Sequence, residues 1–251
     1  MDIHKPKPWH GVREFLKEYA IIVVGVLTAL AAEQAVEWLH WRHLAQSAEA
    51  NLDANLKTDL LNAAVRVAVH PCTQMRISEL ADRLRRPDPS WRGAPLAFPA
   101  NLPGLGGNTH DTDLVMPEVI HSPRRYWSQA AWDSALASGV LNHMPRDRVD
   151  AYALSYAQVN VLIAFQVDER RFAPDLEGLA YDHPLSSRER LEAFRALAAM
   201  DRLAQATETS AVLLLREGRR LGLSPPPDKL AQDLAAQRRF RGACVRQPVE
   251  S

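Results

Sequence analysis

The sequence predicts an all-α protein in which an N-terminal transmembrane helix continues into an up-and-down helical bundle. Three observations support this prediction. Fourteen consecutive residues near the N-terminus carry no charge. Apolar residues recur every three or four positions along most of the remaining chain, and no segment has a convincing strand pattern. One long stretch rich in proline and glycine interrupts the helical pattern.

Composition excludes several classes of protein. The 251 residues include 30 Lys+Arg and 30 Asp+Glu, a balance that argues against a strongly basic nucleic-acid-binding module. Two cysteines are too few for a Cys₄ zinc site or a dense disulfide scaffold. We therefore expect a helical protein with no nucleic-acid partner and no resident cofactor.

The apolar segment is long enough to cross a bilayer only if its flanks are included. Residues 19–32 form a helix of roughly 21 Å, which is short for a hydrocarbon core of about 30 Å. Residues 15–39 form roughly 37 Å of helix and are predicted to be the transmembrane helix. Polar and aromatic residues would then mark its ends, with Trp9 and Tyr19 on the near side and Glu33, Gln34, Glu37, Trp38 and Trp41 on the far side.

Two other interpretations of this segment stay open. It could be a buried core helix, although a soluble helix seldom is apolar on all faces. It could instead be a signal peptide, because Ala29-Leu30-Ala31 matches the small-x-small cleavage pattern. Against cleavage, acidic residues precede the apolar core, and helix-forming residues run through the cleavage point to Trp41. An uncleaved anchor is the favoured interpretation.

The basic residues around the segment predict its orientation. Four precede it, namely Lys5, Lys7, Arg13 and Lys17, whereas Arg42 is the only Lys or Arg in the twenty residues after Glu33. By the positive-inside rule, residues 1–14 would lie in the cytoplasm and residues 42–251 in the periplasm of a bacterial inner membrane. Cys72 and Cys244 could form a disulfide in that compartment, or could be two unrelated thiols.

Small residues within the predicted span suggest self-association. Gly25, Ala29 and Ala32 fall at helical spacing, and such a strip lets two spanning helices approach closely. The alternative is that alanine is simply common in helices. A homodimer through these three residues is the specific expectation.

Proline and glycine divide the first half of the chain. The helix that continues from the span should end at His70, because the residue before Pro71 is pushed out of helical geometry. A second short helix should stop before Pro87. Residues 87–123 hold seven prolines and four glycines, so they are predicted to be an irregular loop, either a lid, a docking loop or a disordered excursion. Apolar residues such as Trp91 favour a loop that packs over the helices.

The second half is predicted to be helical again. Ser122-Pro123 resembles a helix start, and Gly139 should end that helix. A long amphipathic helix covers residues 149–167 and is interrupted near Pro174. Ser186 and Glu189 have the spacing of a capping box. The helix that they begin should end at Gly218 or Gly222, and a last helix should cover residues 229–240.

No residue pattern predicts a catalytic or metal site strongly. His110, Asp111, Asp113 and His121 are suitable metal ligands, but they lie in the irregular loop without a known ligand spacing. Glycines 104, 106 and 107 lack the strand and helix that a phosphate cradle needs, so they are interpreted as turn formers. No catalytic, cofactor-binding or metal-binding residue is therefore assigned.

Two further clusters contain residue types that could carry chemistry or bind a partner. Asp168 and Glu169 beside Arg170 and Arg171 are interpreted as a solvated, internally neutralised helix face. The other cluster comprises Arg124, Arg125, Tyr126, Trp127 and Trp132. It could bind a partner, although core packing of a short helix explains its large aromatic residues more simply.

The N-terminal forty residues resemble an uncharacterised family of proteobacterial single-span membrane proteins. The shared pattern has the form FLKE-apolar-VGV-x-x-AL-x-x-EQ, found here in residues 15–34, with Trp38 beyond it. A looser similarity is Trp132-x-x-Ala135-x-x-x-Gly139 before a helix with Tyr152 and Tyr156. The resemblance implies a membrane anchor and assigns no activity.

Three hypotheses of function follow. The first is a non-enzymatic, membrane-anchored periplasmic domain that binds a protein or a small ligand. The second is a metal-dependent enzyme that uses residues 87–123 as a lid. The third is a secreted soluble helical protein, released by cleavage of the N-terminal segment.

Overall fold

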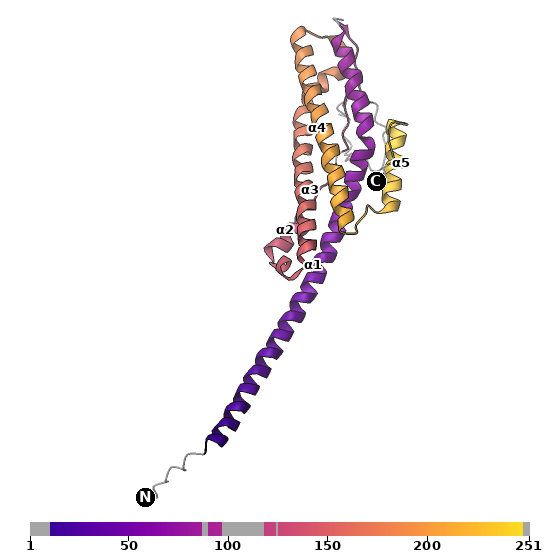
Figure 1. Cartoon of the computed structure of the whole chain (residues 1–251). Coiled ribbons are helices and arrows are strands. Elements are labelled where there is room, and N and C mark those ends of the chain that lie inside the picture. The colour runs from indigo at the N-terminus through magenta and orange to yellow at the C-terminus, as the bar shows by residue number, and fades with distance from the viewer. Residues whose placement is uncertain (1–10, 87–89, 97–117, 124, 248–251) are drawn as a thin grey trace, which may run out of the picture.

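The computed structural model describes residues 11–86, 90–96, 118–123 and 125–247, which form an almost entirely helical protein (Figure 1). The elements follow in the order α1 (Val12–Arg85), β1 (Ser90–Trp91), α2 (Ala130–Ala137), the 3-10 helix η1 (Val140–His143), α3 (Arg146–Phe172), the 3-10 helix η2 (Pro174–Ala180), β2 (His183–Pro184), α4 (Ser187–Arg220) and α5 (Pro227–Arg241). The all-α prediction is confirmed, apart from an antiparallel pairing of the two-residue strands β1 and β2.

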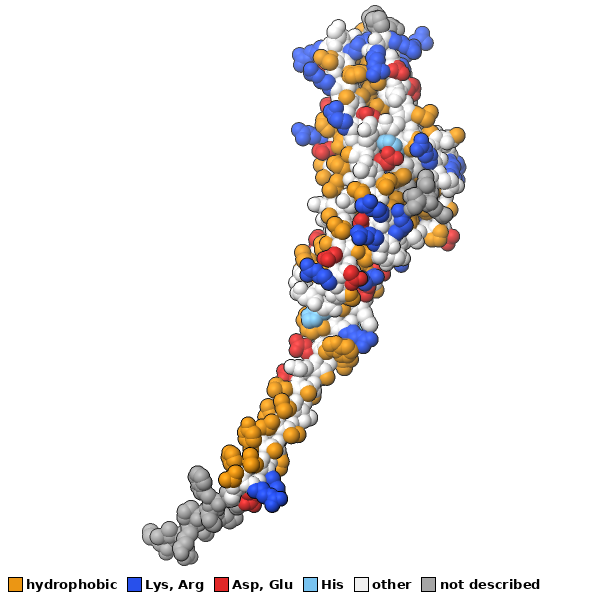
Figure 2. Space-filling model, in the orientation of Figure 1, with side chains coloured by type: hydrophobic (Ala, Val, Ile, Leu, Met, Phe, Trp, Pro, Cys, Tyr) orange, Lys and Arg blue, Asp and Glu red, His pale blue; other side chains and the backbone are white. Residues whose placement is uncertain are grey.

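Helix α1 has 74 residues, and its two halves lie in opposite environments. The N-terminal half of α1 projects away from the other helices (Figure 1), and nearly all side chains of residues 12–44 are exposed. Buried residues begin at Ala45 and recur to Leu84. Hydrophobic side chains cover much of the visible face of the projecting half (Figure 2). This half contains a window that is long and apolar enough to cross a membrane, and none of the window is buried in the protein.

The prediction that His70 and Pro71 end the first helix is wrong. Pro71 lies inside α1, and the expected second helix is simply the end of α1, which stops at Arg85 as predicted. An interior proline removes a helical hydrogen bond and crowds the preceding turn. The C-terminal segment covers this turn, because the N–H of Arg246 donates to the carbonyl oxygen of Ala68 at 3.0 Å. Cys72, next to the proline, forms a disulfide with Cys244, which decides between the two alternatives for the cysteines.

The helix expected at Ser122-Pro123 begins only at Ala130. The described residues before it are held in extended form by side chains of α1. Asn62 donates to the carbonyl oxygen of Tyr126 at 2.9 Å, and the N–H of Ser128 donates to a carboxylate oxygen of Asp59 at 3.3 Å. These tertiary hydrogen bonds outweigh the local helix-start signal. The predicted end is confirmed, because Gly139 has a φ of +73° directly after α2.

The remaining helices follow the sequence closely. Helix α3 includes the predicted residues 149–167, and η2 begins at Pro174. The capping box of α4 is present: the hydroxyl oxygen of Ser186 accepts from the N–H of Glu189 at 3.2 Å, and the carboxylate of Glu189 accepts from the N–H of Ser186 at 2.8 Å. Helix α5 includes residues 229–240.

Three buried clusters hold the helices together. The first lies around Leu52, Leu56, Tyr152 and Tyr156, towards the projecting end of α1, and the second lies around Leu80 and Leu84 at the other end. The third packs α5 and the C-terminal segment on α1. Helix α4 packs against both α1 and α3 (Figure 1).

Only the two ends of the predicted irregular loop are described. The buried indole of Trp91 donates to the carbonyl oxygen of Leu179 at 2.9 Å, so this end packs over the helices as expected. The loop ends meet each other, because the N–H of Leu96 donates to the carbonyl oxygen of Glu118 at 2.8 Å. Gly93 allows a close approach to η2, since a Cβ there would lie 2.4 Å from the carbonyl oxygen of Ala180.

Candidate functional site at the base of the bundle

Two hollows lie where the projecting half of α1 enters the bundle, one on either side of Trp41. The first, the junction cavity, has a volume of about 330 Å³. It is lined by Trp38, Trp41, Arg42, Ala45, Gln46, Glu49, His143, Met144 and Pro145. The second, the alanine groove, has a volume of about 570 Å³. It is lined by Trp41, Leu44, Ser47, Ala48, Asn51, Ala130, Ala131, Ser134, Ala135, Ser138 and Val140.

The backbone between α2 and α3 forms one wall of the junction cavity. Gly139 ends α2 in a left-handed conformation, and η1 makes one tight turn to His143. Val140 and Met144 are buried in the core on either side of that turn. Their burial fixes the exposed His143 against α1, where its ring stacks on Trp41 with centroids 4.0 Å apart and planes 7° from parallel.

A polar network adjoins the junction cavity through Glu49, which is part of the cavity lining. The guanidinium of Arg148 pairs with Glu49 and lies 3.7 Å from Asp53. It also donates to the phenol oxygen of Tyr152 at 3.1 Å, and the Tyr152 hydroxyl donates to Asp53. Burial, together with the bond to Asp53, raises the pKa of Tyr152 above its ordinary value, so the phenol stays neutral.

The mouth of the junction cavity is cationic and aromatic. The guanidinium of Arg42 lies 5.2 Å from the ring centroid of Trp38, in cation–π geometry. Among the described residues, no carboxylate forms an ion pair with Arg42, whereas Glu49 is paired with Arg148. The guanidinium of Arg42 is therefore a positive charge at the mouth that has no ion-pair partner among the described residues. The alanine groove has no charged residue in its lining.

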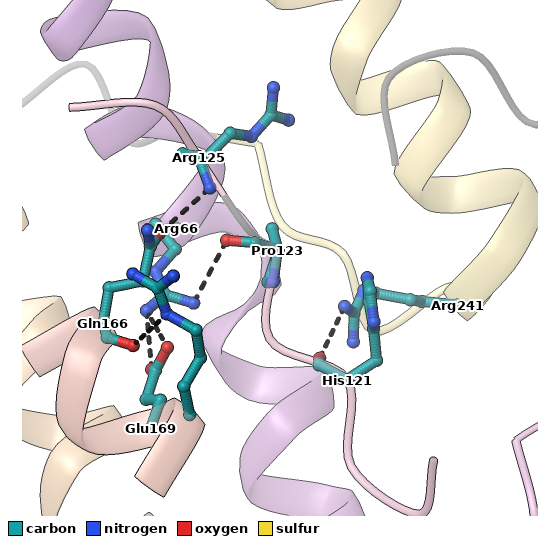
Figure 3. Close-up of polar contacts among 8 residues, drawn as sticks. Arg66, His121, Pro123, Arg125, Gln166, Glu169 and Arg241 are labelled. Carbon is teal, nitrogen blue, oxygen red and sulfur yellow. Dashed lines mark hydrogen bonds and ion pairs between the residues drawn. The ribbon is translucent and has the colours of Figure 1, made fainter. Parts of the chain in front are cut away.

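A second polar cluster lies higher in the bundle and holds residues 121–123 and 125 between three helices (Figure 3). The guanidinium of Arg66 donates to both carboxylate oxygens of Glu169 at 2.6 Å and to the carbonyl oxygen of Pro123 at 3.4 Å. Arg241 of α5 donates to the carbonyl oxygen of His121 at 2.7 Å. Burial, followed by repulsion from Arg66, lowers the pKa of Arg241 to about 10, so this side chain is still charged at neutral pH. We interpret the cluster as structural, because its donors bind backbone carbonyls and a paired carboxylate.

This cluster corrects the interpretation of Asp168 and Glu169 as a solvated face. Glu169 is buried, and its partner is Arg66, 103 residues away, rather than the arginines beside it in sequence. Helical spacing could have predicted the burial of Glu169, since it lies two helical turns after the buried Leu162 on the same face of α3.

The aromatic cluster that was weighed as an interaction surface is mostly core. Trp127 is buried, and Trp132 stacks on Tyr156 with centroids 5.5 Å apart. Arg125 pairs with Asp233 of α5 at 2.9 Å. Only Tyr126 is largely exposed, and Arg124 lies outside the described residues. Core packing therefore accounts for both tryptophans.

Of the four candidate metal ligands, only His121 lies among the residues that the structure describes. His110, Asp111 and Asp113 lie outside the described residues, as do glycines 104, 106 and 107. His121 is buried with its Nδ1 atom 2.8 Å from a carboxylate oxygen of Glu118. Within the described ranges, no three His, Cys, Asp or Glu residues could hold a metal ion together.

Comparisons with models of protein families, with curated proteins and with solved structures find no match for this chain. The base of the bundle is thus interpreted from its own geometry. Trp38 and Trp41 were expected at a membrane boundary, but the contact of His143 with Trp41 was missed. The two residues are far apart in sequence, and the only local signal was the turn that Gly139 imposes.

Proposed function

We propose that this chain is a single-pass protein of the bacterial inner membrane. Residues 15–39 span the lipid bilayer, residues 1–14 lie in the cytoplasm, and residues 42–251 form a periplasmic, up-and-down helical bundle. The bundle is a non-enzymatic binding domain for a protein or a small ligand, held close to the membrane surface. Membership of the single-span family that the N-terminus resembles stays a prediction.

The observation that carries the anchor is the uncovered apolar half of α1. Leu27 is 59% exposed, and its apolar neighbours are exposed on all faces of the helix. In water this surface would be unfavourable, whereas lipid would cover it. The hydroxyl of Thr28, within the uncharged segment, is satisfied inside the helix, since it donates to the carbonyl oxygen of Val24 at 2.7 Å. Such back-bonding suits a helix that is surrounded by hydrocarbon.

Two independent features support a periplasmic bundle. Basic residues predominate before the span and not after it. The Cys72–Cys244 disulfide is of a kind that persists in the oxidising periplasm and is rare in the cytoplasm. A bundle in the cytoplasm would have to keep this disulfide against reduction.

The binding role rests on the base of the bundle. The junction cavity and the alanine groove are concave, accessible and close to the proposed membrane surface. A binding site for a ligand or partner that approaches along the membrane fits these features.

Membrane retention tests the anchor with a matched pair of variants. Leu27→Arg places a charge at the centre of the proposed span, and Leu191→Arg places the same charge at an exposed position of α4. We expect full-length wild-type protein and Leu191→Arg to stay in membranes washed with carbonate, and Leu27→Arg to be largely lost from them. Wild-type protein that washes off and stays monodisperse without detergent would contradict the proposal.

Protease treatment of intact spheroplasts tests the orientation. We expect the bundle to be digested from outside and the N-terminal segment to be protected. Protection of the bundle would place it in the cytoplasm. A mature N-terminus at Ala32 would instead establish the secreted form that the Ala29-Leu30-Ala31 pattern allows.

The homodimer through Gly25, Ala29 and Ala32 also stays a prediction. Apart from the adjoining turns of α1 itself, no atom lies within 4 Å of the place that a Cβ on Gly25 would occupy, so this part of α1 is open to a second helix.

A separate protein partner for the bundle is part of the proposal, and we expect it to bind at the base of the bundle.

A further inference from the structure

We propose that the junction cavity binds the phosphate headgroup of an anionic phospholipid from the bilayer in which α1 is anchored. This inference rests on the proposed anchor, and it names the ligand of the site at the base of the bundle. In this arrangement Arg42 contacts the phosphate, Trp38 and Trp41 flank the glycerol region, and His143 closes the wall towards the bundle.

The cavity lies at the depth where headgroups would be found. Arg42 is three residues beyond the proposed span, which is a rise of roughly 4.5 Å along the helix. Trp38 is 58% exposed at the end of the span. Tryptophan is enriched at this level of a membrane because its ring is apolar and its N–H is polar. The cavity is thus continuous with the surface that lipid would cover.

The charges around the cavity match a phosphate group. Arg42 has no carboxylate partner among the described residues, whereas Glu49 is ion-paired with Arg148, which also lies 3.7 Å from Asp53. The nearest acidic residues of the span point elsewhere, because Glu37 lies about 140° and Glu33 about 180° around the helix from Arg42. A guanidinium that is not otherwise paired binds phosphate oxygens with two parallel hydrogen bonds.

The shape of the cavity favours a headgroup that remains attached to lipid. Its volume of about 330 Å³ is at the small end of ligand sites, and its lining includes the indole rings of Trp38 and Trp41. A lipid that carries the headgroup would also cover the indole rings of Trp38 and Trp41, which free phosphate would leave in water.

Lipid binding to the full-length protein in dodecyl maltoside tests this inference. Dioctanoylphosphatidylglycerol is titrated, and the bound lipid is counted by native mass spectrometry. The zwitterionic dioctanoylphosphatidylcholine and inorganic phosphate serve as comparison ligands. The variant is Arg42→Gln, and its matched control is Arg146→Gln, which removes the same charge from an exposed arginine at the start of α3. Both arginines are exposed, so neither variant should unfold the bundle.

We expect one tightly retained phosphatidylglycerol for each wild-type chain, with at least tenfold weaker binding to Arg42→Gln and an unchanged affinity for Arg146→Gln. Phosphatidylcholine should bind less tightly than phosphatidylglycerol. His143→Ala should weaken binding several-fold, because it removes the ring stacked on Trp41.

Several results would overturn the inference. They are equal binding of phosphatidylglycerol to wild-type protein and Arg42→Gln, no retained phosphatidylglycerol on the wild-type chain, and displacement of the lipid by an equal concentration of inorganic phosphate. The anchor is judged separately, by carbonate extraction. If the protein stays in membranes but wild type and Arg42→Gln bind phosphatidylglycerol equally, only the lipid site is refuted. If the protein washes off, the anchor is refuted.

Discussion

The two halves of α1 form one continuous helix, yet different forces would hold them in place. Residues 12–44 carry apolar side chains on every face and contact little of the protein. Residues 45–85 have one apolar face in the core and also bury polar groups with specific partners, such as Asn62 and Arg66. Helix formation does not distinguish them. The difference is that the second half has to select particular neighbours, whereas the first needs only an apolar environment.

Loss of the disulfide should give the largest effect, because it should destabilise the bundle half of α1 and leave the projecting half unchanged. Replacing Cys72 and Cys244 together by serine should lower the free energy of unfolding of the bundle by about 5 kcal/mol, because the crosslink joins residues 172 positions apart and restricts the unfolded chain. Urea unfolding in detergent, followed by circular dichroism, measures this change. The projecting half of α1 should keep its helicity in the micelle.

Reductant provides the control for this experiment. Reduced wild-type protein should unfold like the double serine variant, and that variant should be insensitive to reductant. A stability loss below about 1 kcal/mol would mean that the crosslink contributes little to holding the C-terminal segment on α1.

Asp59 should make only the bundle half sensitive to pH. Burial raises its pKa from 3.8 to about 7, partly opposed by the hydrogen bond from the N–H of Ser128. The folded state therefore binds more protons than the unfolded state between these two pH values. The contribution of protonated Asp59 to the free energy of unfolding is complete below about pH 4 and is lost as the pH rises through about 7. The loss is about 4 kcal/mol from a shift of this size.

Asp59→Asn keeps the acceptor for Ser128 and removes the titration. We expect this variant to be more stable than wild type at pH 8 and indistinguishable from it at pH 4, measured by urea unfolding at each pH. Parallel pH profiles for the two proteins would show that Asp59 does not titrate in this range.

A pair of leucine truncations compares the halves directly. Leu56 has no exposed surface, so Leu56→Ala should cost the bundle about 3 kcal/mol through lost burial and a residual cavity. Leu27→Ala, in the projecting half, should change bundle stability by less than about 0.5 kcal/mol. Thermal unfolding in detergent measures both changes. Similar losses would mean that the two halves unfold as one unit.

The smallest effect concerns self-association. Gly25→Leu should leave bundle stability unchanged and weaken a dimer through the span by about 1 kcal/mol, because a leucine would hold two helices apart. Val26→Leu is the control, since it alters an exposed residue outside the strip of small residues. Energy transfer between labelled chains in vesicles measures the association. Equal transfer for both variants would exclude Gly25 from the contact.

Sequence reasoning succeeded where the determining contacts are local. Ser186 and Glu189 specify the start of α4 within four residues, and Gly139 specifies the end of α2 by its backbone conformation alone. The end of α1 before Pro87 is likewise set by neighbouring residues. At the end of α1 a distant residue adds to the local signal, because Arg190 of α4 donates to the carbonyl oxygens of Leu84 and Arg86 at 2.9 Å.

The errors have the opposite origin. Pro71 did not end α1, because the distant C-terminal segment supports that turn, and Ser122-Pro123 did not begin a helix, because α1 holds the following residues extended. Glu169 and His143 were missed because their partners, Arg66 and Trp41, lie about a hundred residues away in the chain. A contact between residues so far apart in the chain produces no recurring pattern in the sequence of either segment.

The unbroken course of α1 from its first residue to its last has a mechanical consequence. The helix rises by roughly 70 Å from the end of the proposed span to Arg85. A tilt of about 20°, which is average for spanning helices, would carry its far end sideways by roughly 20 Å. A rotation of the span about its own axis would likewise turn the bundle with it. The bundle would thus behave as a lever arm that converts small rearrangements within the lipid into large displacements of its outer end.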